Sequence, residues 1–264
     1  MEKGLSRDTQ TILRFLSEDK KEEMLFFAHD SSQVEYTQLQ SDKEVAELFS
    51  NLSSSFLSTL TPEEQEVLKY YTGTSYKEIN ACLRDNWDYE TNGLLTPEKK
   101  QRYMYIANVM KGIIAKCPSL GTNLKVYRGT SLKQFRSYGI ESLADLKAME
   151  GNYFYDKSFT STSLIRERSL LGVDNFFTGE RNIEIEYMIP EACADGALLL
   201  GDASSYYKGE SEFLINANNL TKITSVEIDE ANNKAYIKAV LIPKMLWDPP
   251  YMMTEDINKQ NKIG

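Results

Sequence analysis

Hydrophobic residues in the first half of the chain recur every three or four positions, the period of an amphipathic helix. The clearest stripe consists of Val45, Leu48, Phe49, Leu52, Phe56 and Leu60. Thr61-Pro62 with Glu64 predicts a helix start closed by a capping box. Ser75 with Glu78 repeats the pattern, so a further helix is expected to begin there.

The longest helix is expected to open at Thr96-Pro97 and to end near Pro118. Its buried stripe would contain Tyr103, Met104, Ala107, Met110, Ile113 and Ile114. Residues 1–42 are charged and mixed around one apolar group, Met24-Leu25-Phe26-Phe27. This composition predicts a short helical arm of unknown role before the main domain.

After Pro118 the hydrophobic period changes to two, which is typical of half-buried strands. The predicted strands are 124–127, 183–189, 211–216, 222–228 and 235–242, the last two joined by a turn at 229–233. Because helices come first and strands follow, the pattern favours an α+β fold over a doubly wound parallel sheet. We expect N-terminal helices followed by a mixed, mainly antiparallel two-sheet β core.

Composition narrows the possible chemistry. The 264 residues suffice for one large domain with an appendage, and 39 acidic against 30 basic residues give a net charge of −9, which argues against nucleic acid as partner. The single histidine, His29, excludes histidine-based triads and multi-histidine metal sites, so no metal is expected.

The three cysteines form no pair motif and are interpreted as packing thiols. Neither a signal peptide nor a membrane span is apparent, which predicts a soluble protein.

The first motif that carries chemistry is Arg128-Gly129 at the end of a predicted strand. The planar guanidinium can bind a diphosphate or a carboxylate, and glycine lets a ligand approach the backbone closely. Taken alone, the motif is weak, and an ordinary surface arginine is the favoured explanation.

The second motif is Phe159-Thr160-Ser161-Thr162-Ser163, an aromatic residue followed by four hydroxyl residues. Hydroxyls on an extended segment can bind a ribose or hold a catalytic carboxylate in orientation. The alternative is an ordinary polar edge strand or turn.

The third motif runs from Ser204 through Tyr206, Tyr207 and Glu210 to Glu212, at the start of a predicted strand. In a strand, Glu210 and Glu212 would point to the same face, where two carboxylates suit a cationic group. Acidic residues on a solvated strand face are the alternative.

The order of these motifs resembles that of the Arg-Ser-Glu class of mono-ADP-ribosyltransferases, particularly bacterial actin-directed toxin components and related effector domains. Tyr76, Ile79, Asn80, Leu83 and Arg84 resemble the helical signature of that family. Residues 184–190 resemble its strand before a mobile loop. The resemblance covers about residues 60–243. We therefore divide the chain into an arm (1–42), an ADP-ribosyltransferase catalytic domain (43–248) and a C-terminal tail (249–264).

The resemblance implies that NAD is the substrate and that ADP-ribose is transferred to a target protein. Glu212 would stabilise the ribosyl cation, and Ser161 would hold Glu212 and line the nicotinamide pocket. Arg128 would clamp a phosphate, Gly129 would bind the carboxamide through its backbone, and Phe159 would pack beneath the pocket. An anion suits this role because positive charge builds on the ribose as nicotinamide leaves.

Acceptor choice is implied by Glu210, since this family has Glu there for arginine acceptors and Gln for asparagine acceptors. The expected acceptor is thus an arginine of actin or of another protein. Tyr206 and Tyr207 would face the target. Arg166, Arg168, Phe176 and Phe177 are candidates for a second phosphate contact and a nicotinamide cover, and a solvated basic loop is the alternative.

The expected biology is that of a monomeric secreted toxin or virulence effector. It would be made in a bacterial or phage-infected cytoplasm and delivered by a route independent of a signal peptide. Two alternatives remain open at this point. One is an NAD glycohydrolase that acts by depletion, and the other is a catalytically silent relative that binds a partner protein.

Overall fold

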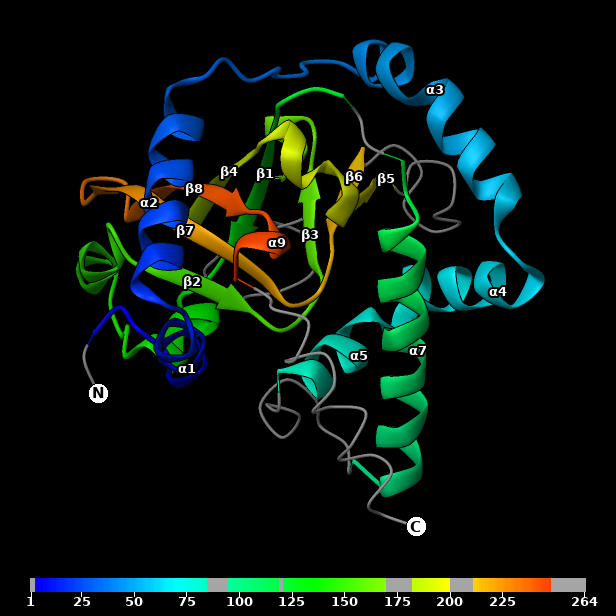
Figure 1. Ribbon diagram of the computed structural model, residues 1–264, viewed down its shortest axis with the longest axis horizontal. Helices are drawn as coiled ribbons and strands as arrows, with labels where there is room; N and C mark the ends of the chain where they lie inside the picture. The colour runs from blue at the N-terminus through cyan, green and yellow to red at the C-terminus, as the bar shows by residue number, and fades with distance from the viewer. Residues whose placement is uncertain (1–2, 85–94, 119–120, 170–181, 200–210, 248–264) are drawn as a thin grey trace.

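The computed structural model describes residues 3–84, 95–118, 121–169, 182–199 and 211–247 of the chain (Figure 1). The α-helices are α1 (Arg7–Phe15), α2 (Glu18–Gln33), α3 (Asp42–Thr59), α4 (Pro62–Tyr70), α5 (Tyr76–Leu83), α7 (Pro97–Ala115) and α9 (Lys244–Trp247). The strands are β1 (Leu124–Thr130), β2 (Tyr153–Asp156), β3 (Thr160–Ser163), β4 (Ile183–Ile189), β5 (Ala197–Leu199), β6 (Glu212–Ile215), β7 (Asn219–Asp229) and β8 (Lys234–Ile242). A π-helix (Tyr71–Ser75) and 3-10 helices at Leu132–Tyr138, Ala144–Met149 and Glu191–Gly196 complete the described elements.

The strands form one sheet in the order β2-β7-β8-β4-β1-β3-β6-β5. Among these described strands, β4 and β8 pair in parallel, and the other neighbouring strands pair antiparallel. The predicted α+β architecture, with helices before a mixed and mainly antiparallel sheet, is confirmed. The core is one continuous sheet and not the two sheets that we expected, because Tyr127 of β1 pairs with Ser163 of β3.

Five of the described α-helices, α1, α2, α3, α4 and α7, begin directly after a serine or threonine whose side chain caps the first turn. Thr61 Oγ1 accepts from the Glu64 amide at 3.2 Å, and Glu64 Oε2 accepts from the Thr61 amide at 3.0 Å, which is the predicted capping box. The box predicted at Ser75 is wrong. Ser75 has helical backbone angles and no capping bond, because the π-helix leads directly into α5. A capping serine needs an extended backbone.

The N-terminal arm folds back onto the sheet. In Figure 1, α2 lies across β7 and β8, while α1 lies below it near β2. Met24 and Ile12 share a hydrophobic cluster with Leu220, Ile242 and Trp247, and Met24 is fully buried. The arm therefore contributes to the core on this side of the molecule.

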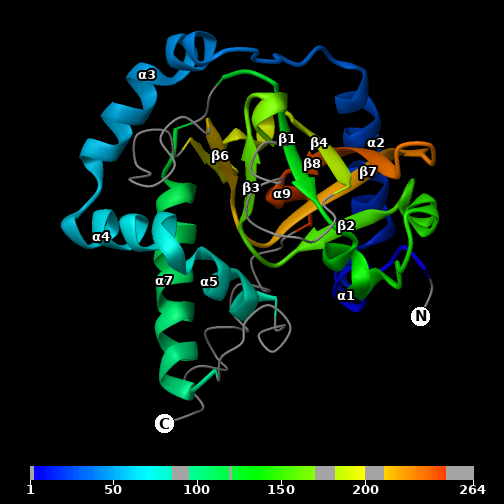
Figure 2. The same cartoon turned by 180° about the vertical axis from the view of Figure 1, so that it is seen from behind.

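A second helical group covers the β3-β6-β5 half of the sheet. Figure 2 shows α4, α5 and α7 together beside β3 and β6. Their apolar side chains enclose Phe159 and Leu214, both fully buried. Among the described residues, none of the helices has the length and apolar character needed to span a bilayer.

All three cysteines lie among the described residues and are in the reduced form, outside any disulfide; Cys82 and Cys193 are buried. The thiol of Cys193 donates to the carbonyl oxygen of Leu241 at 3.3 Å. Their placement fits the interpretation as packing residues.

Candidate active site

The centre of the candidate site is a contact between the neighbouring strands β3 and β6. Ser163 lies opposite Glu212 in the antiparallel register, so Ser161, two residues earlier, shares a face with Glu212. The Ser161 hydroxyl donates to Glu212 Oε1 at 2.5 Å. This distance is typical of a charge-assisted O–H···O⁻ bond. The serine therefore fixes the orientation of this carboxylate.

Arg128 reaches the same point from β1. Its Nη1 donates to the carbonyl oxygen of Ser161 at 2.7 Å, so it contacts the main chain of the residue whose side chain holds Glu212. Arg128 and the following Gly129 are partly exposed, and Gly129 pairs with Glu184 of β4. The three motifs, separated by up to 84 positions in sequence, converge on one part of the sheet, because β1, β3 and β6 are consecutive in its strand order.

An aromatic pair lies behind this contact. Phe159 is fully buried and meets Tyr71 edge-on, with ring centroids 5.1 Å apart. Asn80 connects the two, because its amide nitrogen donates to the Tyr71 hydroxyl at 3.3 Å and its oxygen accepts from the Phe159 amide at 3.2 Å. Burial raises the pKa of Tyr71, and the negative charge of Glu212 raises it further. Tyr71 thus remains a neutral wall of the site.

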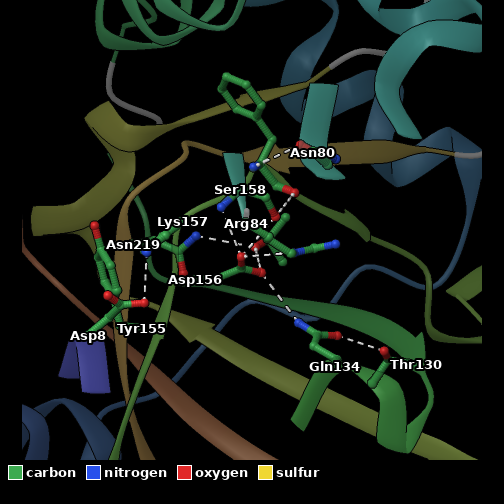
Figure 3. A network of polar contacts seen from close by, with 12 residues as sticks. Asp8, Asn80, Arg84, Thr130, Gln134, Tyr155, Asp156, Lys157, Ser158 and Asn219 are labelled. Atoms are coloured by element: carbon green, nitrogen blue, oxygen red, sulfur yellow. Dashed lines mark hydrogen bonds and ion pairs between the residues drawn. The ribbon is translucent and has the colours of Figure 1, made fainter. Parts of the chain in front are cut away.

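Beside the site, Asp156 at the end of β2 organises a buried polar network (Figure 3). One carboxylate oxygen accepts from the amide and hydroxyl of Ser158 at 2.9 and 2.8 Å and from Arg84 Nε at 3.4 Å. The other accepts from Gln134 at 3.4 Å and from Thr160 at 3.3 Å. These bonds tie the connection between β2 and β3 to Arg84 at the end of α5.

Asp156 is charged despite its burial. Desolvation alone would raise the pKa of this carboxyl, but Arg84, the Ser158 amide and Arg128 outweigh it, and the pKa lies below its ordinary value. Sequence reasoning missed both Asp156 and Gln134. The available signal was the Asp-x-Ser spacing before the hydroxyl run, since an aspartate often binds the amide two residues ahead.

Two arginines proposed as phosphate ligands have carboxylate partners within the chain. Arg166 Nε donates to Glu184 Oε1 at 2.6 Å, and the guanidinium lies 6.0 Å from the centroid of the Tyr127 ring. Arg168 forms an ion pair with Asp42, the first residue of α3. Either arginine would have to leave its carboxylate before it could bind a phosphate.

The alternation argument for Glu210 and Glu212 does not hold. The predicted strand 211–216 begins one residue later, at Glu212, and Ser211 has a left-handed backbone with φ of 47°. A period of two therefore does not extend through Ser211. Glu210, Tyr206 and Tyr207 lie outside the described residues, as do Phe176 and Phe177.

Comparison with known families decides the wider assignment. A family model described as ADP-ribosyltransferase exoenzyme matches residues 42–244, which is most of the chain. The chain belongs to the ADP-ribosyltransferase exoenzyme family. It is accordingly a bacterial-type mono-ADP-ribosyltransferase, and the resemblance stated from the three motifs is confirmed.

Solved structures with the same fold agree with the family. The C3 exoenzyme of Clostridium limosum is 18% identical, with a TM-score of 0.60, over 79% of this chain and 98% of that chain. C3stau2 from S. aureus with NAD is 19% identical, with a TM-score of 0.60, over 80% and 100%. BECa of C. perfringens, solved with NADH, is 20% identical, with a TM-score of 0.60, over 78% of this chain and 50% of that chain. At these identities the likeness shows the fold.

No curated protein matches the sequence of this exoenzyme family member. Two of the structural relatives contain NAD or NADH, which is consistent with NAD as the substrate of the family.

A cavity of about 760 Å³ lies elsewhere, between α2 and the segment 190–192. Its lining residues include Phe26, Phe27 and Asp30, and none of the residues of the three motifs. Within the described ranges, no cluster of three or more His, Cys, Asp or Glu side chains is suited to hold a metal ion. The described residues of the three motifs meet instead where β1, β3 and β6 lie side by side.

Proposed function

We propose that this chain cleaves NAD at the bond between nicotinamide and ribose and transfers ADP-ribose to an arginine of a target protein. The observation that supports the proposal most directly is the Glu212 carboxylate, held by Ser161 at 2.5 Å beside Arg128. Family membership supports the reaction class, and this contact supports Glu212, Ser161 and Arg128 as the residues that carry it.

In the proposed reaction, Glu212 is the catalytic anion. The bond from ribose to nicotinamide breaks, its electron pair leaves with nicotinamide, and positive charge develops on the ribose. A fixed carboxylate stabilises that charge more in the transition state than in the ground state, which lowers the barrier. The hydrogen bond from Ser161 keeps the carboxylate in place, so little reorganisation is needed when the charge develops.

Arginine side chains are the groups that would bind the diphosphate of NAD. Arg84 and Arg128 both lower the pKa of the Asp156 carboxyl electrostatically, so both guanidinium groups lie near this part of the sheet. Arg128 would bind a phosphate of NAD through its planar guanidinium. Gly129 would let the nicotinamide carboxamide approach the backbone of β1, and Phe159 with Tyr71 would form the wall behind it.

The arginine acceptor is proposed from the identity of Glu210. A carboxylate can align a guanidinium through two hydrogen bonds and accept the proton that is lost as its nitrogen attacks the ribose. Tyr206 and Tyr207 are proposed to face the target protein, which is actin or another protein with an exposed arginine.

We also propose the division into an arm (1–42), a catalytic domain (43–248) and a tail (249–264). In biological terms, the proposal is a secreted virulence factor that modifies a protein of a target cell.

Labelled NAD tests this function directly. The wild-type chain incubated with a cell lysate should label a protein band, and Glu212→Ala should abolish the label. Glu227→Gln is the matched control, because it removes an exposed carboxylate on β7. An unchanged band with Glu212→Ala would overturn the catalytic role of Glu212.

Acceptor specificity needs a second variant. Glu210→Gln should abolish transfer to arginine while much of the nicotinamide release remains, because release depends on Glu212. Equal loss of both activities would remove the acceptor role of Glu210. Nicotinamide release from the wild type without any acceptor labelling would instead indicate an NAD glycohydrolase.

A further inference from the structure

Three side chains from distant parts of the sequence meet at the start of β6. They are Asp42, the first residue of α3, Arg168, shortly after β3, and Ser211, directly before Glu212. The Ser211 hydroxyl donates to Asp42 Oδ1 at 3.0 Å and accepts from Arg168 Nη1 at 3.3 Å. Arg168 Nη2 also pairs with Asp42 Oδ2, which closes a ring of polar contacts.

The backbone of Ser211 explains why these contacts matter. Its φ of 47° lies in the left-handed region, which non-glycine residues adopt at a cost of about 1–3 kcal/mol unless neighbouring contacts enforce it. Here the side chain is held by Asp42 and Arg168, and the carbonyl oxygen accepts from the Leu164 amide at 3.1 Å. Ser211 is only 7% exposed, so these contacts replace water.

Global stability does not account for this arrangement. The side chains of Asp42 and Arg168 are 59% and 26% exposed, and ion pairs at such positions contribute only about 0–1 kcal/mol. The hydrogen bond from Arg168 lowers the pKa of Asp42, so the carboxylate is charged at neutral pH. The contacts converge on the residue whose backbone sets the direction in which β6 begins.

We propose that Asp42, Arg168 and Ser211 are positioning residues for Glu212, a role that rests on the proposed function. By fixing the turn at Ser211, they determine where the Glu212 side chain leaves the backbone, so that its carboxylate meets Ser161. Arg168 thus acts through Ser211 and Asp42, in place of the phosphate contact considered from the sequence.

Kinetics of nicotinamide release distinguish positioning from substrate binding. Asp42→Asn and Ser211→Ala should each lower kcat by about tenfold while KM for NAD stays within about twofold, because misplacing a catalytic group by a fraction of an ångström affects the transition state first. Glu47→Gln is the matched control, since Glu47 also lies on α3 and pairs with Lys43 at 3.8 Å. It should leave both constants unchanged.

A glycine variant separates the hydroxyl from the backbone. Ser211→Gly adopts the left-handed conformation without strain. It should lose as much kcat as Ser211→Ala, because both lack the hydroxyl that Asp42 and Arg168 bind. Wild-type kcat in Ser211→Gly or in Asp42→Asn would overturn the proposal. So would a raised KM with unchanged kcat in Arg168→Lys, which would indicate direct contact with NAD.

Amide hydrogen exchange gives a readout that does not need activity. In Asp42→Asn and Ser211→Ala, the Leu164 amide should exchange about tenfold faster than in Glu47→Gln, because its acceptor at Ser211 is no longer fixed. Unchanged exchange would overturn the proposal. If the wild type releases no nicotinamide, the proposed function fails, and hydrogen exchange still decides whether these residues fix Ser211.

Discussion

Replacing Ser161 with alanine removes a hydroxyl that donates to the Glu212 carboxylate at 2.5 Å. A hydrogen bond to a charged group contributes about 1.5–3 kcal/mol, and each 1.4 kcal/mol of lost transition-state stabilisation lowers the rate about tenfold. The full range therefore corresponds to a loss of about 10- to 150-fold in kcat. Because Glu212 is partly exposed and water can replace part of the bond, we expect about 10- to 30-fold.

Thr162→Val is the matched control for this substitution. Thr162 is the neighbouring residue, and its hydroxyl donates to the carbonyl oxygen of Phe213 at 2.5 Å, across the same two strands. Valine has nearly the same shape, so this variant loses a similar bond without affecting Glu212. It should lower the free energy of unfolding by about 1 kcal/mol and leave kcat unchanged.

The assay is steady-state nicotinamide release over a range of NAD concentrations, with thermal unfolding followed by circular dichroism. For Ser161→Ala we expect reduced kcat and a melting temperature lowered about as much as in Thr162→Val, so that only the loss of activity distinguishes the two variants. The reasoning is refuted if Ser161→Ala retains kcat within about twofold, or if Thr162→Val loses as much activity.

The remaining predictions concern stability. Met24→Ala should lower the free energy of unfolding by about 2–5 kcal/mol because Met24 is fully buried, whereas Phe26→Ala on the same helix, at a residue 68% exposed, should change it little in urea titrations. Asp156→Asn should lower the free energy of unfolding by about 3–5 kcal/mol in the same urea titrations, because it removes the buried carboxylate that pairs with Arg84. Burial raises the pKa of Tyr138 and Tyr153 to about 12, so between pH 10 and 12 they ionise only in the unfolded chain, and stability should fall as pH rises. A tyrosinate absorbance titration that shows all tyrosines ionising near pH 10 would contradict this.

Local rules predicted much of the fold. The capping box at Thr61 and the strands 183–189 and 235–242 follow from patterns within a few residues of each other, and each is present. The parallel pairing of β4 with β8 was not predictable in this way, because it depends on which strands become neighbours. The box at Ser75 failed for a similar reason, since the preceding π-helix sets the backbone there.

The candidate site was predictable in its residues and less so in its contacts. Arg128, Ser161 and Glu212 stood out through their order, and the sheet brings them together. The partners of Arg166 and Arg168 were not predictable, because Arg168 and Asp42 are 126 positions apart in sequence. The left-handed backbone of Ser211 likewise had no sequence signal, since serine rarely adopts it.

The central claim is that Glu212 drives transfer of ADP-ribose from NAD to a guanidinium. The most direct measurement is mass spectrometry of agmatine, a small guanidinium compound, after incubation with NAD and either the wild type or Glu212→Gln. The wild type should produce agmatine that carries one ADP-ribose, and Glu212→Gln should produce none. Equal product from both proteins, or release of nicotinamide by the wild type without any modified agmatine, would contradict the account.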